Sequence, residues 1–380
     1  MIVNKPPMGW NSWNTFGANI SESLIFETAD AMVNEGLLDC GYEYLVIDDC
    51  WSMKTRDADG KLVPDPEKFP HGMKYVADYV HSKGLKFGMY SCIGSYTCAE
   101  YPGSYNHEYT DAASLAEWGV DLLKYDFCFR DENVPAKILY RRMGLALANC
   151  GRDILLSTSS FGKEETEKWI RTTGAGMWRF TGDIFDTWGS LRKITERAID
   201  RIDNNYKGCF MDMDMLVVGM NGKGNVAMDD QRLSFEEYKF HFSLWALFGS
   251  PLMIGCDIRN MTDETKQILT NKDVIAISQD PGCYQIMTHK HPPHEPFIAF
   301  RMLSNGDIAL GVFNLGDTPS DQWGSWLIPE EFGWTRESGT RLLMRDLWDG
   351  TEKYVENDII MESGIPAHAC RLYRISLVKE

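Results

Sequence analysis

The sequence predicts an α/β protein, with a parallel (β/α)8 TIM barrel followed by a C-terminal antiparallel β-sandwich domain. Three observations lead to this prediction. Short apolar runs alternate with helical patterns eight times along the chain, which is typical of a closed parallel barrel. After about Pro281 short β-type runs follow one another instead, joined by turn residues. The 380 residues also exceed the roughly 250 of a single barrel, so there is room for a second domain.

Eight short apolar runs are the candidate barrel strands. They lie near residues 7 to 10, 44 to 47, 87 to 90, 122 to 125, 154 to 157, 177 to 180, 208 to 211 and 251 to 255. Each is short enough for a buried strand, and the segments between them are long enough for a helix.

Helical patterns fill the segments between these strands. One pattern has apolar residues at the spacing i, i+4, i+7, i+8, which gives a helix one buried face: Ile25, Ala29, Met32 and Val33. Ser234 and Glu237 have the spacing of a capping box, which predicts that a helix begins there and continues through Leu247.

The C-terminal quarter of the chain has a different pattern. Four runs predict antiparallel strands, at 297 to 303, 308 to 314, 341 to 347 and 370 to 375. Turn pairs such as Asn305-Gly306 and Asp349-Gly350 separate them. Residues 282 to 295, with Pro292 and Pro293, are predicted to be a linker. We therefore expect a catalytic barrel over residues 1–281 and an antiparallel β domain over 282–380.

Composition and charge narrow the class of partner. Lys and Arg number 38 against 55 Asp and Glu, a net charge of -17, which argues against nucleic acid and against an anionic membrane surface. No run approaches the roughly 18 apolar residues of a membrane span, and residues 1 to 8 lack the features of a signal peptide. We therefore expect a cytoplasmic protein whose ten cysteines are mostly buried thiols. The sequence leaves homo-oligomerisation open.

Two aspartates are the strongest candidates for chemistry, because each follows an apolar run where a barrel strand would end. They are Asp126 in LLKYDFC and Asp183 in WRFTGDI. Runs at 44 to 49, 210 to 215 and 252 to 257 also end in acidic residues. In a parallel barrel such strand ends converge on one mouth, where active sites are found. Two carboxylates at one mouth are the minimum that hydrolysis of a glycosidic bond requires.

Eight short motifs in order give the chain a recognisable family pattern. They are MGWNSW (8 to 13), IDDCW (47 to 51), YPGS (101 to 104), KYD (124 to 126), Trp-Arg with Asp183 (178 to 183), DMDM (212 to 215), SPLMIGCD (250 to 257) and QDP (279 to 281). With these motifs the chain resembles glycoside hydrolase family 27, the retaining glycosidases that include α-galactosidase and α-N-acetylgalactosaminidase, and the resemblance covers essentially the whole chain. The resemblance implies a barrel followed by an antiparallel β domain, in agreement with the fold expected above.

The resemblance assigns the two catalytic roles. Asp126 matches the nucleophile and Asp183 the acid/base, whose carboxyl groups should lie about 5 to 5.5 Å apart in a retaining enzyme. Lys124 has the same facing as Asp126 on a strand, so we expect its ammonium to keep that carboxylate ionised. Asp183 should sit in a drier place with a raised pKa, so that it can donate a proton.

The resemblance also assigns the residues that bind the sugar. Asp48 and Asp49 match a pair that accepts from the 4- and 6-hydroxyls, and Arg179 and Asp214 match positions near the 2- and 3-hydroxyls. The remaining matches are Trp13 and Tyr90, as an aromatic wall for the pyranose, Lys124, which also binds sugar hydroxyls, and Cys98, which with Cys128 matches a family disulfide.

One departure concerns the 2-position of the sugar. Galactosidases of the family carry Cys-Glu-Trp after the fifth strand, and this chain has STSSFG at 157 to 162. Ser160, or Ser159 in the other register, stands where that glutamate would be. A small hydroxyl there resembles the members that accept a 2-acetamido group. The expected activity is therefore retaining removal of terminal α-linked galactose, without metal or organic cofactor, and α-N-acetylgalactosaminidase is the alternative.

Alternative interpretations of the same residues remain. A strand-end aspartate could be only a helix N-cap, and Arg179 could form a salt bridge inside the barrel. Lys124 could instead be the Schiff-base lysine of an aldolase-type barrel. A sugar-binding module is disfavoured because both catalytic acids are present. His289, His291 and His294 lack the spacing of a metal site and are read as a solvated linker.

Overall fold

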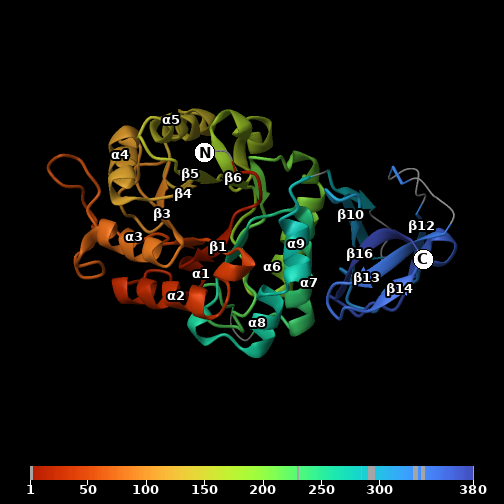
Figure 1. Cartoon of the computed structure of the whole chain (residues 1–380). Helices are drawn as coiled ribbons and strands as arrows, with labels where there is room; N and C mark the ends of the chain where they lie inside the picture. The colour runs from red at the N-terminus through yellow and green to blue at the C-terminus, as the bar shows by residue number, and fades with distance from the viewer. Residues whose placement is uncertain are drawn as a thin grey trace.

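The computed structural model describes residues 3–228, 231–283, 285–289, 296–327, 333–334 and 339–379. In Figure 1 the N-terminal part of the chain forms a ring of helices around a central sheet, and the blue C-terminal strands form a second unit beside it. His291, His294, Pro292 and Pro293, which belong to the predicted linker, lie outside the described residues.

The first eight strands form one parallel sheet in the order β7-β6-β5-β4-β3-β2-β1-β8. Their bounds are β1 Met8–Asn11, β2 Tyr44–Val46, β3 Lys86–Cys92, β4 Leu122–Asp126, β5 Leu155–Ser159, β6 Ala175–Arg179, β7 Phe210–Asp212 and β8 Leu252–Ile254. The segment after β7 closes the ring, because Leu216 forms a parallel bridge with Ile254 of β8. Eight parallel strands in cyclic order confirm the predicted barrel, and all eight candidate runs contribute a strand.

Helices occupy the segments between the strands. They are α1 Trp13–Phe16, α2 Glu22–Asn34, α3 Gly72–Ser82, α4 Glu108–Trp118, α5 Ala136–Ala148, α6 Trp188–Ile199, α7 Phe235–Phe248, α8 Asp263–Leu269 and α9 Lys272–Ser278. Short 3₁₀ turns lie at Leu38–Cys40, Lys163–Lys168, Ile170–Thr172, Ile202–Asn204, Ile258–Asn260 and Glu356–Asp358.

Two local predictions about these helices can be compared with the structure. Ser234 accepts from the backbone of Glu237, whose side chain accepts from the backbone of Ser234, so the capping box is confirmed. In α2, Ile25 and Met32 are fully buried, but Val33, predicted on the same face, is 39% exposed. Val33 lies in the last turn of α2, where the helix passes the edge of the core.

The C-terminal unit is antiparallel, as predicted. Its strands are β9 Met287–His289, β10 Phe297–Met302, β11 Ile308–Phe313, β12 Trp323–Trp326, β13 Thr340–Asp346, β14 Glu352–Tyr354, β15 Ile359–Glu362 and β16 Cys370–Lys379. Six form a sheet in the order β14-β13-β16-β11-β10-β9, and β12 pairs with β15 in a second sheet. The sequence prediction missed β9, which lies inside the predicted linker, and the short strands β12, β14 and β15.

The two units share an apolar junction. Alternate residues of β10 divide between two cores, since Phe297 belongs to the barrel core and Ile298 to the core of the β domain. The ring of Phe313 on β11 meets Phe240 of α7 edge to face, with 5.1 Å between ring centroids. Such packing between α7 and the β domain joins the units without using the mouth of the barrel.

A search of the described helices for a membrane span found none of sufficient length and apolar character.

Candidate active site

The carboxyl ends of adjacent strands bring functional side chains into one row. Parallel pairing aligns Cys92 on β3, Asp126 on β4, Ser159 on β5, Arg179 on β6 and Asp212 on β7. Residues paired in this way face the same side of the sheet. The strand ends therefore place a nucleophile candidate, a cation and a second acid side by side.

A pocket opens at this end of the barrel and collects every predicted site residue except Ser160. It is lined by Trp13, Asn14, Asp48, Asp49, Tyr90, Cys98, Lys124, Asp126, Phe161, Arg179, Asp183, Asp214 and Met215. Acidic side chains outnumber Lys124 and Arg179. Carboxylates accept hydrogen bonds and donate none when ionised, so the lining suits a neutral ligand rich in hydroxyl donors.

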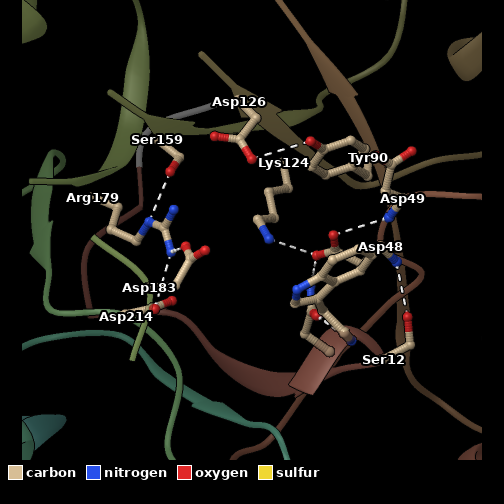
Figure 2. A network of polar contacts seen from close by, with 12 residues as sticks. Ser12, Asp48, Asp49, Tyr90, Lys124, Asp126, Ser159, Arg179, Asp183 and Asp214 are labelled. Atoms are coloured by element: carbon tan, nitrogen blue, oxygen red, sulfur yellow. Dashed lines mark hydrogen bonds and ion pairs between the residues drawn. The ribbon is translucent and has the colours of Figure 1, made fainter. Parts of the chain in front are cut away.

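Asp48 is the centre of a buried hydrogen-bonded group at the end of β2. Its Oδ2 accepts from Lys124 Nζ at 2.6 Å and from Asn11 Nδ2 at 2.7 Å, and the pair is visible in Figure 2. Although burial alone would lower the pKa of Lys124, the charges of Asp48 and Asp126 raise it. Lys124 is therefore an ammonium ion paired with Asp48, and not the neutral amine that a Schiff-base lysine needs.

Asp49, the neighbour of Asp48, is held by backbone donors. Its Oδ1 accepts from the amide of Cys50 at 2.7 Å and its Oδ2 from the amide of Ala99 at 3.2 Å. Burial raises the pKa of Asp49 in spite of these bonds. The two adjacent acids thus have different partners, a lysine for one and amides for the other.

Asp126 is fully inside the pocket, with only 6% of the residue exposed. Its Oδ2 accepts from the Tyr90 hydroxyl at 3.1 Å and its Oδ1 from the amide of Phe127 at 3.0 Å. Burial raises the pKa of Asp126, and the charges of Arg179 and Lys124 oppose that rise without cancelling it. The charge of Lys124 thus helps to keep this carboxylate ionised, as expected, although the ammonium pairs directly with Asp48.

Asp183 has the opposite environment. Its side chain is 57% exposed, and its Oδ1 accepts from Arg179 Nη1 at 2.8 Å. Burial of its inner part raises the pKa of Asp183, but the charges of the adjacent Arg179 and of Lys124, with the hydrogen bond from Arg179, lower it by more than burial raises it. The pKa of Asp183 therefore lies below its ordinary value. The prediction of a raised pKa for Asp183 is wrong in this structure. The sequence could not give the cause, since it does not show that Arg179 turns toward a residue four positions later.

Arg179 joins the fifth, sixth and seventh strand ends. Its side chain is 5% exposed and donates from Nε to Ser159 Oγ at 2.7 Å, while Nη1 also pairs with Asp214 at 3.0 Å. Figure 2 shows the guanidinium between Ser159, Asp183 and Asp214. A salt bridge was one of the alternatives left open for Arg179. Arg179 forms it and also lines the pocket.

The two serines that replace the family glutamate point to different places. Ser159 contacts Arg179, whereas Ser160 is 1% exposed and its hydroxyl bonds to Thr166 Oγ1 at 2.6 Å. Ser160 also accepts from the amide of Gly162, so its hydroxyl stabilises the turn after β5. The structure therefore favours Ser159, not Ser160, as the hydroxyl near the sugar-binding residues.

Asp214 has an unusual backbone conformation. Its φ is 81°, a value that non-glycine residues rarely adopt. Its Oδ2 accepts from the amide of Ile184 at 2.8 Å, and its carbonyl accepts from Trp245 Nε1 at 2.7 Å. Cys50, Phe129 and Phe161, each just beyond a barrel strand, also have positive φ. Backbone strain of this kind is typical of functional sites whose surroundings hold it in place.

Several lining residues were not predicted from the sequence. Asn14 is 2% exposed, and its Nδ2 has no hydrogen-bond partner. Phe161 follows the two serines, and Asp212 lies beneath the pocket with its pKa raised by burial and by Asp214 to about 7. The motif MGWNSW ends directly before Asn14, and the motif DMDM begins with Asp212. Neither motif shows which side chains turn inward.

Cys98 and Cys128 form a disulfide beside Asp126, which joins the loops after β3 and β4. Cys50 is a buried free thiol. Cys98, Cys128 and Asp126 also make the one cluster of potential metal ligands found among the described residues. Because both sulfurs are used in the disulfide, they are not available as thiolate ligands.

Comparisons with known proteins agree with this geometry. The family described as alpha galactosidase A matches residues 5–280, and its C-terminal β-sandwich domain matches residues 298–375. An α-galactosidase of Cyamopsis tetragonoloba is 41% identical over 370 residues, which are 97% of this chain and 85% of that protein. Among solved structures, α-galactosidase I of Mortierella vinacea has a TM-score of 0.89 at 31% identity, covering 98% of this chain and 97% of that one. The Saccharomyces cerevisiae α-galactosidase solved with raffinose has a TM-score of 0.85 at 28% identity, covering 99% of this chain and 98% of its own.

Proposed function

The chain belongs to glycoside hydrolase family 27, and we propose that its pocket removes terminal α-linked galactose by a retaining double displacement. It is an α-galactosidase, since relatives about 40% identical over nearly the whole chain carry that activity in their names. These relatives do not favour the α-N-acetylgalactosaminidase alternative. The observation that carries the mechanism is the placement of Asp126 and Asp183 on one pocket, one buried and one exposed.

In the first step the Asp126 carboxylate attacks the anomeric carbon of the galactoside. The bond from that carbon to the glycosidic oxygen breaks, and Asp183 gives its proton to the departing oxygen. The products are a galactosyl ester on Asp126 and the free alcohol of the aglycone. The Tyr90 hydroxyl, which donates to Asp126, stabilises the attacking carboxylate and orients it.

In the second step water hydrolyses the ester. The Asp183 carboxylate takes a proton from water, the water oxygen attacks the anomeric carbon, and the Asp126 carboxylate leaves. Two inversions at one carbon return the α configuration. The enzyme regains its starting protonation, because Asp183 is protonated again.

Substrate binding favours the protonated form of Asp183, which the first step requires. Asp183 is more than half exposed, so a galactoside in the pocket would cover it and disfavour its charged form. We expect the pKa of Asp183 to rise when galactose binds. Titration of the labelled carboxyl by ¹³C NMR, with and without galactose, measures this shift, and an unchanged or lower pKa with galactose would refute it.

The hydroxyls of the sugar are recognised by groups whose partners are already fixed. Asp48 and Asp49 offer acceptor oxygens for the 4- and 6-hydroxyls, and Lys124 offers donors at the same place. Asn14 adds an amide whose N–H groups are unpartnered and buried. A preorganised set of this kind binds a polar ligand with little rearrangement.

Two measurements test the proposed function together. Rates on p-nitrophenyl α-galactoside and on its 2-acetamido analogue should differ strongly in favour of the galactoside, since the relatives are galactosidases. NMR of the first product formed should show α-galactose, because the mechanism retains configuration. Early β-galactose would contradict the double displacement, and preference for the 2-acetamido substrate would contradict the substrate assignment.

We keep cytoplasmic location and a possible self-association as proposals. The location has a direct test in the Cys98 and Cys128 pair. Disulfides are rare in reducing compartments, so alkylation of thiols before cell lysis should label both cysteines if the protein is cytoplasmic. Protection of both cysteines from alkylation would count against that location.

A further inference from the structure

A buried arginine at the junction of the two units has no hydrogen-bond partner for most of its guanidinium. Arg301 lies on β10 and is 3% exposed. Its strand neighbours at alternate positions, Phe297 and Ala299, belong to the barrel core, so Arg301 faces the barrel and not the core of the β domain. The Nε and Nη2 atoms of Arg301 are buried without an acceptor.

Two acids of the same region already accept hydrogen bonds from other groups. Asp280 accepts from the backbone and hydroxyl of Ser304, and Asp203 accepts from Gln285 Nε2 at 2.9 Å. Within the described residues, no ion pair includes Arg301. Burial lowers the pKa of Arg301 to about 10, and the charge of Asp280 opposes that change, so the group still carries its charge at neutral pH. A buried charge that is not hydrogen-bonded to a counter-ion is costly to the fold.

Arg301 and Asn205 bring donor nitrogens to one small cavity, whose wall also includes Asp203, a carboxylate that accepts from Gln285. A Cβ atom at Gly249 would lie 3.1 Å from Arg301 Nη1 and 3.3 Å from Asn205 Nδ2, so the two nitrogens lie on the same side of this glycine. Asn205 accepts from the amide of Met211 through its oxygen and donates to the carbonyl of Phe248 through Nδ2, which leaves one N–H of that nitrogen for this side. Lys207 lines the same cavity and donates to the carbonyl of Pro281.

The cavity is small and lined by residues of both units. Its volume is about 30 Å³, and its wall includes Ile202, Phe210 and Ile286 beside the polar groups. A space of this size holds a single water-sized species. Water alone would give Arg301 no adjacent negative charge, whereas a monatomic anion would supply one and accept from the surrounding N–H groups.

We propose that Arg301, Asn205 and Lys207 form a binding site for a halide ion, chloride under ordinary conditions, at the junction of the barrel and the β domain. The site lies at the opposite end of the barrel from the catalytic pocket, because Phe210 begins β7 and Pro6, another wall residue, precedes β1. Residues at that end of a barrel contribute to stability and not to catalysis. The halide therefore stabilises the packing of the two units and leaves the chemistry of Asp126 unchanged.

Crystals of the full chain soaked in bromide give the direct test, since bromide scatters anomalously. An anomalous peak within hydrogen-bonding distance of the Arg301 guanidinium is expected. No peak there, or a water with the arginine bonded to protein acceptors, would overturn the proposal. Because this measurement uses the wild-type protein, it does not depend on whether any variant folds.

Thermal unfolding gives a second test in solution. The anion of the buffer salt is changed from gluconate, which is too large for the cavity, to chloride at constant ionic strength. The Tm of the wild type should rise by about 3 °C when chloride is well above its Kd, since only the folded state has the site. Sulfate, which is larger, should give no such rise, and an equal rise with sulfate would contradict a halide site.

Arg301→Met and a matched control separate the site from a general effect of salt. Arg301→Met should lose the chloride dependence, and in gluconate it should be at least as stable as the wild type because no buried charge is left unpaired. Arg345→Met removes an equal charge from the exposed pair with Asp273 and should keep the dependence. Equal chloride dependence in both variants would refute the proposal. Galactosidase rates well below the Tm should not change with chloride, so this outcome is separate from that of the proposed function.

Discussion

The mouth of the barrel and the junction with the β domain both bury charged side chains, but the partners of these side chains differ between the two regions. At the mouth, Lys124 is paired with Asp48, and Arg179 with Asp183 and Asp214. At the junction most of the contact is apolar, as between Phe240 and Phe313, and the buried Arg301 forms no ion pair with any residue that the structure describes.

This difference indicates that the mouth serves activity and the junction serves stability. Paired charges at the mouth hold carboxylates at fixed places around a pocket, at a cost in desolvation that only function explains. Apolar packing at the junction stabilises the fold and needs no such arrangement. Changes at the mouth should therefore reduce activity with little effect on stability, and changes at the junction should do the reverse.

The largest effect is expected at the nucleophile. Asp126→Asn should reduce kcat/KM by roughly 10⁴-fold or more, because the galactosyl ester cannot form. The melting temperature should stay within a few degrees of the wild type, since removing the negative charge also removes a desolvation cost. Steady-state rates and thermal unfolding of the same preparation measure both. A variant that retains even a few per cent of wild-type activity without added azide or formate would show that another group attacks.

The next effect is expected at the acid/base and depends on the leaving group. Asp183→Ala should slow alkyl α-galactosides by roughly 10²- to 10⁴-fold, because their oxygen needs a proton as it departs. Activated aryl galactosides should lose much less in their first step. The ratio of kcat/KM between the two substrate types is the measurement. A ratio equal to that of the wild type would remove Asp183 from the role.

The junction gives the matching test of stability. Phe313→Ala removes a ring that is 0% exposed and should lower the free energy of unfolding by about 3 to 5 kcal/mol. Galactosidase activity per folded molecule should be unchanged. Denaturant unfolding with an activity assay measures both. Met361→Ala, in the same domain but 52% exposed, should have little effect on either, and a loss as large as that of Phe313→Ala would mean that burial is not the cause.

The smallest effect concerns Asp212, beneath the mouth, whose pKa is raised by burial to about 7. The folded protein holds this proton at pH values where the unfolded chain has lost it, so wild-type stability should fall as pH rises from about 4 to about 7. Asp212→Asn keeps a neutral side chain that can still accept from the amide of Asp214. Its Tm relative to the wild type should therefore increase by a few degrees between pH 4 and pH 8. A difference in Tm that does not change with pH would contradict the raised pKa.

Much of the fold could be predicted from the sequence because local patterns carry it. All eight barrel strands follow apolar runs, and the capping box at Ser234 and Glu237 fixes the start of α7. The weakest predictions were the short strands at the edges of the β domain. The three residues Glu352–Tyr354 are all exposed and contain no apolar run, so only the pairing with β13 makes this segment a strand.

The sequence by itself determined most of the side chains that line the mouth, since all predicted site residues except Ser160 lie there and the carboxyl ends of parallel barrel strands converge on that place. It did not determine how the charges there pair. Lys124 lies two residues from Asp126 yet binds Asp48, and Arg179 lowers the pKa of Asp183 when the sequence had suggested a rise. Such pairing depends on distances of a few ångströms between strands far apart in the chain, and on burial that differs between neighbours. Only the tertiary structure sets those distances, and electrostatic energy changes steeply with both.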